Sequence, residues 1–405
     1  TRPAVDRPCQ FAAQRTDADL NPVDDPVTLY CAPADDVLPR PGACLVTGIT
    51  PQHAKREGVV EAEFAWEIRD QMMQPGTCCV GYNSIRFDDE VSRNLFYRNL
   101  HDPYEREWKN GNSRWDLINL VRMCYALRPD GVEWPMVDLQ PGTESPGQRP
   151  SFRLEDLTRA NNIGHEGAHD ALADVHATIE LARLVRKAQP RLFDWSLKLR
   201  NKNAARKLLD LENPTAVIHT SGRIPSVRGC TTLVLPLSAH PTNNKAVIVF
   251  DLMGDARTLI DSDSDEIRDR VFTPGKDLPE GVERLPLKAI KWTAVPMLAP
   301  SGVLAGTAQD RIGLDSVLCA ENTDLLLANI HSVRRNVQEA FHLEYEDGKR
   351  DPDLALYGGG FFDDADRHRM QLIHQCTPAE IAEKQWDFND ERLPLMLLRF
   401  RARNW

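Results

Sequence analysis

The chain lacks any long hydrophobic run. None of its 405 residues lie in a stretch that approaches the roughly 18–20 apolar residues of a membrane-spanning helix, and no signal peptide is visible. Its nine cysteines show neither CxxC nor zinc-ligand spacing, since Cys78 and Cys79 are merely adjacent. This cysteine usage is typical of a reducing compartment. We therefore expect a cytoplasmic protein with neither a membrane anchor nor a structural metal.

The chain also lacks an excess of positive charge. Its formal net charge is −11, which argues against a protein that simply coats nucleic acid, although local fields matter more than the sum. Residues 183–207, RLVRKAQPRLFDWSLKLRNKNAARK, carry nine Lys and Arg side chains and a single acid, Asp194. This segment is either a solvated helical face or a surface for an anionic partner, and both interpretations stay open.

Both ends of the sequence are unusual. The chain begins TRPAVDRP, without Met, and stops at RFRARNW within an apolar, helix-like run. We expect a piece of a longer protein. A length of 405 residues is sufficient for two or three domains.

The first half of the chain alternates strand-like and helix-like runs. Two strand-like runs lie within 8–31, and a short buried strand is predicted over 77–83. Helices are predicted over about 58–73, 88–100, 115–127 and 151–163, with Asp88 or Asp89 and Ser151 as N-caps. Segment 129–150, rich in Pro and Gly, is predicted to be a loop. The alternation indicates an α/β layer fold.

The pattern changes after about residue 190. Short β-rich runs such as CTTLVLPLSAH and KAVIVFDLMG, separated by turn residues, predict a small antiparallel barrel or sandwich. From about residue 308 the pattern becomes helical again. No internal repeat and no low-complexity segment is seen.

Residues 168–187, AHDALADVHATIELARLVRK, predict a helix with acidic residues at its start. Its expected buried stripe has steps of three and four and consists of Leu172, Val175, Ile179 and Ala182. Asp174 lies at the edge of that stripe, where a carboxylate needs a partner. His169 lies about 140° from Asp174 around a helix, so both reach one place only if His169 is on the preceding loop.

A second acidic motif, GYNSIRFDDE over 81–90, predicts a buried strand that presents Asp88 at a helix start. Taken alone, Asp88 could be a simple N-cap, and Asp174 a surface carboxylate. Taken together with His169, they suit two-metal phosphoryl transfer, in which Mg²⁺ ions about 4 Å apart are held by oxygen ligands. A histidine can then accept the proton of the attacking water.

These motifs resemble a known family. GYNSIRFDDE, SFRLEDLTRANNI and AHDALADVHAT are similar to the second and third exonuclease motifs of the DEDDh superfamily. Over nearly the whole chain, segments such as NSRWDLINLVRMCYALRP and LYGGGFFDDADR look like the bacterial exonuclease I family, with a possible insertion near 136–149. The resemblance implies an α/β RNase H-like exonuclease domain over 1–189. An SH3-like β-rich domain over 190–340 and an α-helical domain over 341–405 would follow it.

The same resemblance implies a function and roles for named residues. It implies a 3′→5′ exonuclease that degrades single-stranded DNA to nucleoside 5′-monophosphates in repair and recombination, with two Mg²⁺ ions. Asp88 and Asp174 match metal-binding carboxylates, His169 matches the general base, and Arg153 matches a substrate contact. The family's first motif, Asp-x-Glu, is expected upstream of Thr1. Without that motif, the chain as printed is expected to be weak or inactive.

The resemblance also places residues along the DNA path. Residues 93–116 interleave cations and aromatic side chains, as non-specific single-strand binding requires. Phe96, Leu100 and Trp115 are expected in the core, whereas Tyr104 and Trp108 lie among charged residues and are expected to be exposed. Residues that match DNA contacts of the family are Arg93, Tyr104, Trp108, Arg122 and Lys202.

A protein partner is implied as well. Arg128 and the cationic 183–207 segment match the surface by which the family binds the acidic C-terminal tail of single-stranded DNA-binding protein. We expect a monomer with no membrane contact. Two alternatives stay open: an RNA exonuclease of the same superfamily, and a non-catalytic scaffold that binds single strands or the binding-protein tail.

Overall fold

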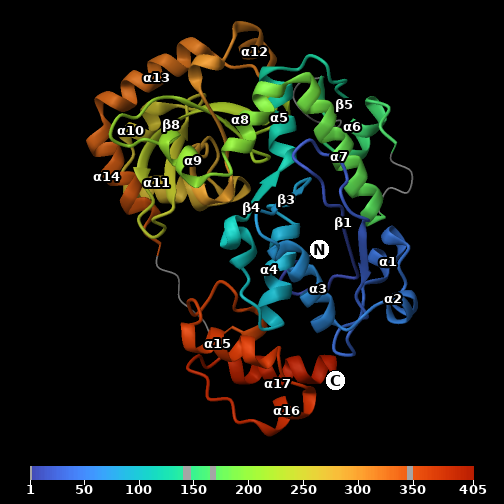
Figure 1. Ribbon diagram of the computed structural model, residues 1–405. Coiled ribbons are helices and arrows are strands. Elements are labelled where there is room, and N and C mark those ends of the chain that lie inside the picture. The colour runs from blue at the N-terminus through green and yellow to red at the C-terminus, as the bar shows by residue number, and fades with distance from the viewer. Residues whose placement is uncertain (1, 140–146, 165–169, 344–349) are drawn as a thin grey trace. The chain divides into compact units, whose positions relative to one another are not determined.

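A computed structural model describes residues 2–139, 147–164, 170–343 and 350–405 (Figure 1). The chain divides into two compact units. The first comprises Thr1–Trp115, Gly164–Glu180 and Glu346–Trp405, and the second comprises Asp116–Ile163 and Leu181–Tyr345. In the described parts of the chain, every helix is too short or too polar to span a bilayer.

The first unit begins with the two expected strands. Strands β1 (Gln10–Ala13) and β2 (Val27–Tyr30) pair antiparallel, with Gln10 opposite Tyr30. Helices α1 (Pro41–Thr47), α2 (Pro51–Glu57) and α3 (Glu61–Met73) follow. The apolar face of α3 is buried in a cluster with residues of the next long helix, and this cluster includes Phe64, Ile68, Leu95 and Phe96.

The next segment of this unit carries the first acidic motif. Strand β3 (Cys78–Gly81) leads into helix α4 (Asp88–Arg98), as the sequence predicts. Strand β4 (Ser113–Asp116) pairs with β3 in a two-stranded sheet. The predicted burial of Phe96, Leu100 and Trp115 is confirmed, since each is at most 2% exposed.

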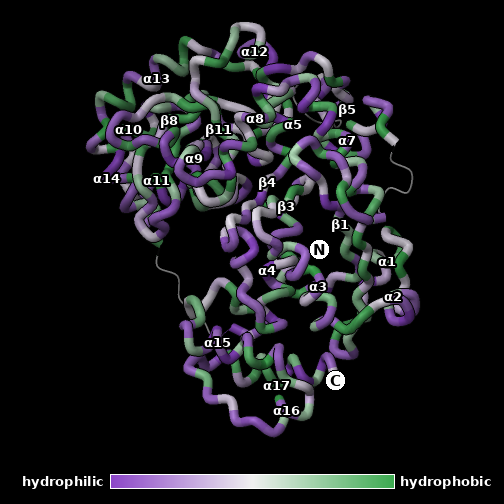
Figure 2. The backbone as a smooth tube through the Cα atoms, in the orientation of Figure 1, coloured by the Kyte–Doolittle hydropathy of each residue, from purple (hydrophilic) through white to green (hydrophobic). Residues whose placement is uncertain are grey.

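The C-terminal segment packs into the same unit. Helices α15 (Asp364–Ile373), α16 (Pro378–Glu383) and α17 (Leu393–Asn404) mix hydrophobic and hydrophilic positions, as Figure 2 shows by colour. Their apolar residues bury Tyr97 and Leu100 at the end of α4. The members from this segment include Met370, Ile373, Met396 and Phe400. The C-terminal segment therefore shares a core with α4.

The second unit begins with a helix that continues directly from β4. Helix α5 (Leu117–Leu127) is N-capped by Asp116, whose side chain accepts a hydrogen bond from the amide of Ile118 at 3.1 Å. Helices α6 (Leu154–Ala160), α8 (Pro190–Lys198) and α9 (Lys202–Leu208) follow. Helix α7 (Ala171–Ala188) spans both units.

The predicted loop over 129–150 is partly wrong. Strands β5 (Met136–Asp138) and β6 (Gln148–Pro150) form a two-stranded antiparallel ladder in this segment. Proline is tolerated in edge strands, and a two-stranded ladder consists only of edges. High Pro and Gly content therefore did not exclude a short hairpin.

The β-rich region forms one antiparallel sheet, so the predicted antiparallel pairing of these strands is confirmed. Its strand order is β10-β9-β8-β7-β11. The strands are β7 (Val217–Thr220), β8 (Thr231–Ala239), β9 (Ala246–Asp251), β10 (Leu287–Lys291) and β11 (Met297–Pro300). Helices around it are α10 (Ala256–Asp261), α11 (Ser264–Phe272), α12 (Gly306–Arg311), α13 (Ser316–Ala328) and α14 (Ile330–Phe341).

Candidate active site

Asp88 is the first residue of α4 and is exposed to solvent. The N-cap of this helix is Phe87, without a side-chain cap hydrogen bond, so the prediction that Asp88 or Asp89 caps α4 is wrong. A capping residue stands outside the helix, whereas Asp88 and Asp89 both lie inside its first turn. Three successive acids in that turn also interact favourably with the positive end of the helix dipole.

Asp89, the neighbour of Asp88, is buried and paired. Its two carboxylate oxygens accept hydrogen bonds from Arg106 at 2.6 Å and Arg114 at 2.5 Å. Burial by itself raises the pKa of Asp89, but the two guanidinium groups outweigh it and hold this pKa below the usual range. The pair of ion pairs fixes the first turn of α4, and with it the position of Asp88.

Removal of this carboxylate should destabilise the fold. Asp89→Ala removes the ion-pair partner of the buried Arg106 and one of the two carboxylates paired with Arg114, which keeps Glu107 at 3.1 Å. We expect the substitution to lower the free energy of unfolding by about 3–5 kcal/mol. Because the folded pKa of Asp89 is lowered, its stabilising effect is present above the unfolded carboxyl pKa of roughly 3.9 and is lost as pH falls through the folded pKa. Urea unfolding at pH 7 and at pH 3 measures both effects.

The exposed neighbour provides the control for this prediction. Asp88→Ala should lower the free energy of unfolding by only about 1 kcal/mol or less, because its carboxylate is exposed and a charge at a helix start contributes no more than that. Equal loss of stability in both variants would contradict the assignment of Asp89 as the buried anchor.

The start of α7 is tied to β1. The backbone oxygen of Asp170 accepts from the amide of Asp174 at 3.1 Å, and its side chain accepts from the amide of Ala173 at 3.3 Å. The Gln10 side chain donates to Asp170 at 3.1 Å. These bonds place the first turn of α7, and hence Asp174, beside the first strand. The proposed general base, His169, lies outside the described residues.

The buried face of α7 differs from the expected stripe. The fully buried residues are Ala177, Leu181, Ala182 and Val185. Of the predicted stripe, Leu172, Val175 and Ile179 are only partly buried, so that prediction is wrong for these three residues. Asp174 precedes Ala177 and Leu181 by three and seven residues and therefore lies on the same face. It is partly buried at the N-terminal end of the inward face.

The chemistry of these two carboxylates fits a divalent metal. Asp88 and Asp174 carry carboxylate oxygens on two different helices of one unit, and carboxylate oxygen is the ligand type that Mg²⁺ prefers. Within the described residues, no group of three or more His, Cys, Asp or Glu side chains could hold a metal ion. The two aspartates are therefore a suitable but partial ligand set.

The candidate DNA contacts on and after α4 form one cluster. The Arg93 guanidinium donates to Glu107 at 2.7 Å and to Glu90 at 2.6 Å, and lies 5.3 Å from the ring centroid of Tyr104. The predicted exposure is confirmed for Trp108, at 65%, but Tyr104 is partly buried. Packing of the Tyr104 ring against Arg93 accounts for this difference.

The other cationic candidates belong to the second unit. Arg122 donates to Asn119 at 3.0 Å, and its Nε is buried with no hydrogen-bond partner among the described residues. Arg153 is exposed and ion-paired with Glu155 at 3.0 Å. Arg153 is also the N-cap of α6, so the predicted cap at Ser151 is wrong. The Ser151 hydroxyl instead donates to the Asp156 carboxylate at 2.5 Å. Lys202 is the exposed first residue of α9.

Two arginines lie at the C-terminal end of α5. Arg128 donates to the backbone oxygens of Leu127 at 2.6 Å and Val303 at 3.1 Å. Arg311 donates to the backbone oxygen of Ala126 at 3.1 Å. Sequence reasoning missed Arg311. Its position near Arg128 depends on its contact with Ala126, which lies 185 residues earlier in the sequence. The two cations form a positively charged site at this helix end.

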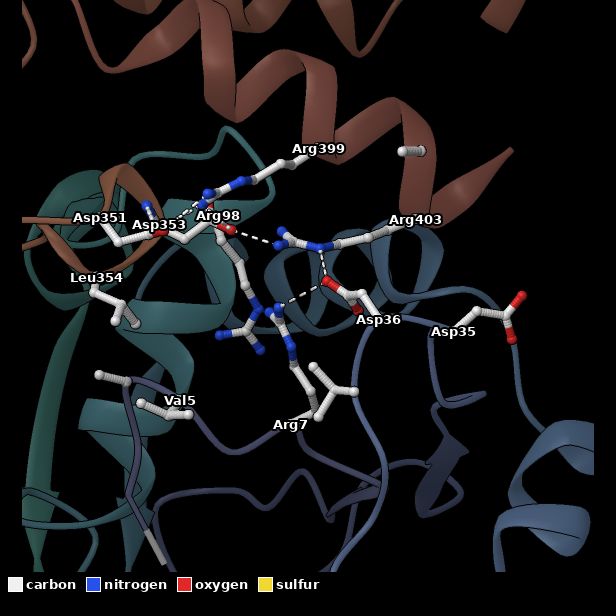
Figure 3. Close-up of a pocket in the computed structure, with 13 residues that line it drawn as sticks. Val5, Arg7, Asp35, Asp36, Arg98, Asp351, Asp353, Leu354, Arg399 and Arg403 are labelled. Atoms are coloured by element: carbon white, nitrogen blue, oxygen red, sulfur yellow. Dashed lines mark hydrogen bonds and ion pairs between the residues drawn. The ribbon is translucent and has the colours of Figure 1, made fainter.

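A cavity of about 520 Å³ lies in the first unit but contains none of the candidate catalytic residues (Figure 3). Arg403 donates to Asp36 at 2.7 Å and to Asp353 at 2.5 Å, and Arg399 donates to Asp351 at 2.5 Å. The arginine and aspartate side chains that line the cavity thus neutralise one another. They form a structural ion-pair network that joins the N-terminal and C-terminal segments of the unit.

Comparisons with known proteins cover the whole chain. Residues 1–182 match the Exonuclease family model, residues 200–343 match the Exonuclease I SH3-like domain, and residues 350–405 match the Exonuclease I C-terminal domain. The chain is 45% identical over 406 residues to exodeoxyribonuclease I of Escherichia coli, covering 100% of this chain and 83% of that protein.

Solved structures agree with the sequence comparison. E. coli exonuclease I in complex with a dA16 oligonucleotide superposes with a TM-score of 0.94 at 44% identity, covering 100% of this chain and 84% of that chain. Exonuclease I of Methylocaldum szegediense gives 0.92 at 48% identity, with 100% and 83% coverage. A zinc-bound complex of E. coli exonuclease I with single-stranded DNA matches with a TM-score of 0.92 at 44% identity. An SSB/exonuclease I structure matches with a TM-score of 0.89 at 43% identity. Both matches cover 100% of this chain and 84% of the other chain.

Proposed function

The chain belongs to the exodeoxyribonuclease I family and is a 3′→5′ exonuclease of single-stranded DNA; on this premise, we propose which of its residues carry out the reaction. Asp88 and Asp174 hold the divalent metal, and His169 is the general base. The observation that supports this assignment best is the position of Asp174, at the inward face of α7 in the turn that Gln10 ties to β1.

The family is metal-dependent, and we propose Mg²⁺ as the ion used by this chain. Asp88 and Asp174 would hold the ions, which would supply positive charge to stabilise the scissile phosphate and the reacting oxygens. His169 would take the proton from the attacking water and so raise its nucleophilicity. The buried Asp89 pair keeps α4 in place, so that Asp88 does not need to reorganise when substrate binds.

We propose that cations and aromatic rings of this chain contact the substrate. Trp108 and Tyr104 offer faces on which bases stack, and Arg93 orients the Tyr104 ring. Arg122, Arg153 and Lys202 provide charge for the phosphates of the strand. These contacts are independent of sequence, which suits an enzyme that removes nucleotides one after another.

We further propose that Arg128 takes part in binding the acidic tail of single-stranded DNA-binding protein. Arg128 is exposed, and Arg311 adds a second cation at the same helix end. Clustered guanidinium groups suit carboxylates, which they can engage by two parallel hydrogen bonds. The protein would act as a cytoplasmic monomer.

The experiment that tests this proposal measures metal-dependent release of mononucleotides. The full-length protein is incubated with uniformly labelled DNA and RNA single strands of equal sequence, with Mg²⁺ or with EDTA. We expect nucleoside 5′-monophosphates from DNA only with Mg²⁺. Faster release from RNA would favour the superfamily alternative, and activity in EDTA would contradict the metal assignment.

A further inference from the structure

Arg122 lies on α5 in the second unit and is partly buried. Its guanidinium donates to the side chain of Asn119 at 3.0 Å and lies 5.9 Å from the ring centroid of Phe152. In the described part of the chain, no carboxylate forms an ion pair with it. A partly buried charge with neutral neighbours is costly unless an anion approaches it. The site therefore suits a phosphate, and the position of the guanidinium decides whether a phosphate can be reached.

The guanidinium of Arg122 lies against the turn that follows β7. This turn is Ser221–Ile224, and the amide of Ile224 closes it by donating to the backbone oxygen of Ser221 at 2.9 Å. A Cβ atom at Gly222 would lie 2.9, 2.9 and 3.0 Å from Nη1, Nη2 and Cζ of Arg122. Heavy atoms in van der Waals contact are normally roughly 3.5–4.0 Å apart. Only a residue without a side chain therefore leaves room for the guanidinium at this place.

The backbone of the turn does not itself require glycine at this position. Gly222 has no positive φ, whereas Gly229 in the same connection between β7 and β8 has a φ of 57°. The second position of the common turn types accepts most residues when its φ is negative. Alanine can therefore adopt the backbone of Gly222. The close approach of Arg122 is the feature of the structure that an added side chain would disturb.

The same turn gathers further positive charge. Arg223 follows Gly222 and is exposed, and Arg149 donates to the hydroxyl of Ser226 at 3.2 Å. Burial raises the pKa of the Cys230 thiol, and the nearby charges of Arg122 and Arg149 oppose this shift. Among the described residues, Arg149 and Arg223 also lack a carboxylate partner. Cations gathered in this way repel one another, so the surface favours an anionic ligand such as the phosphates of a strand.

We infer that Gly222 is a positioning residue, which lets the guanidinium of Arg122 lie against the turn and so sets its contact with a phosphate of the single strand. A methyl group at residue 222 would displace the guanidinium from Asn119. The atoms in its way are the far end of a flexible side chain, so the backbone does not need to move. Gly222 thus acts on binding through Arg122. This inference rests on the proposed function, which assigns Arg122 to the phosphates.

The test measures binding of fluorescent dT16 by the full-length protein in EDTA, which prevents cleavage. Arg122→Ala should bind roughly 10-fold more weakly or worse, because a hydrogen bond between a charged group and a phosphate is lost. Gly222→Ala should bind roughly 3- to 10-fold more weakly, because that hydrogen bond is distorted. In both variants the slope of log affinity against log salt should become shallower, by up to about 0.7. The double variant should bind within about twofold of Arg122→Ala, because no guanidinium is left to position.

Two further variants separate positioning from folding. Gly302→Ala changes a glycine of the same unit, at which an added Cβ has no neighbour within 4 Å, and it should bind dT16 as the wild type does. Arg122→Lys keeps the charge on a narrower head group, so that adding Gly222→Ala to it should change affinity by less than about twofold. Gly222→Ala should melt near the wild-type temperature, because only a side chain moves.

Each contrary outcome has one meaning. Wild-type binding by Gly222→Ala would overturn the inference. A further loss in the double variant as large as the loss in Gly222→Ala alone would also overturn it, because the glycine would then act independently of Arg122. A melting temperature of Gly222→Ala far below that of the wild type would assign the glycine to folding and likewise overturn it. If Arg122→Ala bound dT16 as tightly as the wild type, the proposed phosphate contact of Arg122 would itself be wrong.

Discussion

Asp174→Asn is expected to abolish metal-dependent cleavage in the full-length protein, with a fall in kcat of roughly three orders of magnitude or more. The substitution keeps size and hydrogen-bonding capacity but removes the negative charge that a divalent ion requires. A thousandfold loss corresponds to about 4 kcal/mol of transition-state stabilisation, which is within the range that metal catalysis supplies. Asp174 is partly buried on the inward face of α7, so we do not expect a water molecule to replace its carboxylate as a metal ligand.

The measurement is a single-turnover assay on a labelled DNA strand across a Mg²⁺ titration. If the carboxylate is a metal ligand, high Mg²⁺ should recover part of the lost rate, and the melting temperature should stay near the wild-type value. Glu180→Gln provides the matched control, because it neutralises an exposed acid of the same helix. Wild-type cleavage by Asp174→Asn would remove this residue from the metal site.

The order of elements could be predicted because it depends on local patterns. The two first strands, the buried strand before α4, and the later antiparallel sheet each have a short apolar run bounded by turn residues. The helices that follow them have clear periodicity. These features need no knowledge of distant residues. Apart from the unpredicted β5–β6 hairpin, the strands and helices of this first half lie within a few residues of the predicted bounds.

The face of a helix and the cap of a helix were harder to predict. In α7, apolar residues and alanines cover more than one stripe. Periodicity therefore predicted a buried face with Leu172 and Val175, whereas the structure fully buries Ala177 and Leu181. The choice between such stripes is made by the elements that pack against the helix. At α4, an acid near the helix start resembles a cap in the sequence. In the structure, Asp89 is instead buried, because its carboxylate pairs with Arg106 and Arg114, which come later in the chain.

Sequence reasoning found the acidic motifs around α4 and α7 but missed the contacts that the C-terminal segment makes with α4. Asp88 and Asp174 lie in recognisable motifs, whereas Tyr357 lies in a glycine-rich loop whose partner cannot be read from local pattern. Tyr357 contacts Arg93 across 264 residues of sequence. Such a long-range contact becomes visible only when the fold brings the C-terminal segment onto α4.

His169→Ala is expected to lower kcat by about 10²- to 10⁴-fold while leaving affinity for single-stranded DNA in EDTA nearly unchanged. A general base acts on the attacking water and contributes little to binding of the ground state, so the loss should fall on kcat rather than on KM. The base must be neutral to accept a proton. The wild-type rate should therefore decline at acidic pH, where the base becomes protonated.

The pH profile is the measurement that separates catalysis from structure at this position. In His169→Ala the decline of the rate at acidic pH should disappear and leave a low, flatter profile, which a merely structural defect would not produce. His176→Ala is the matched control, because His176 is an exposed histidine of α7 and should keep both the rate and its decline at acidic pH. If His169→Ala retained that decline, another group would be the base. If it lost DNA affinity in EDTA, the histidine would belong to substrate binding instead.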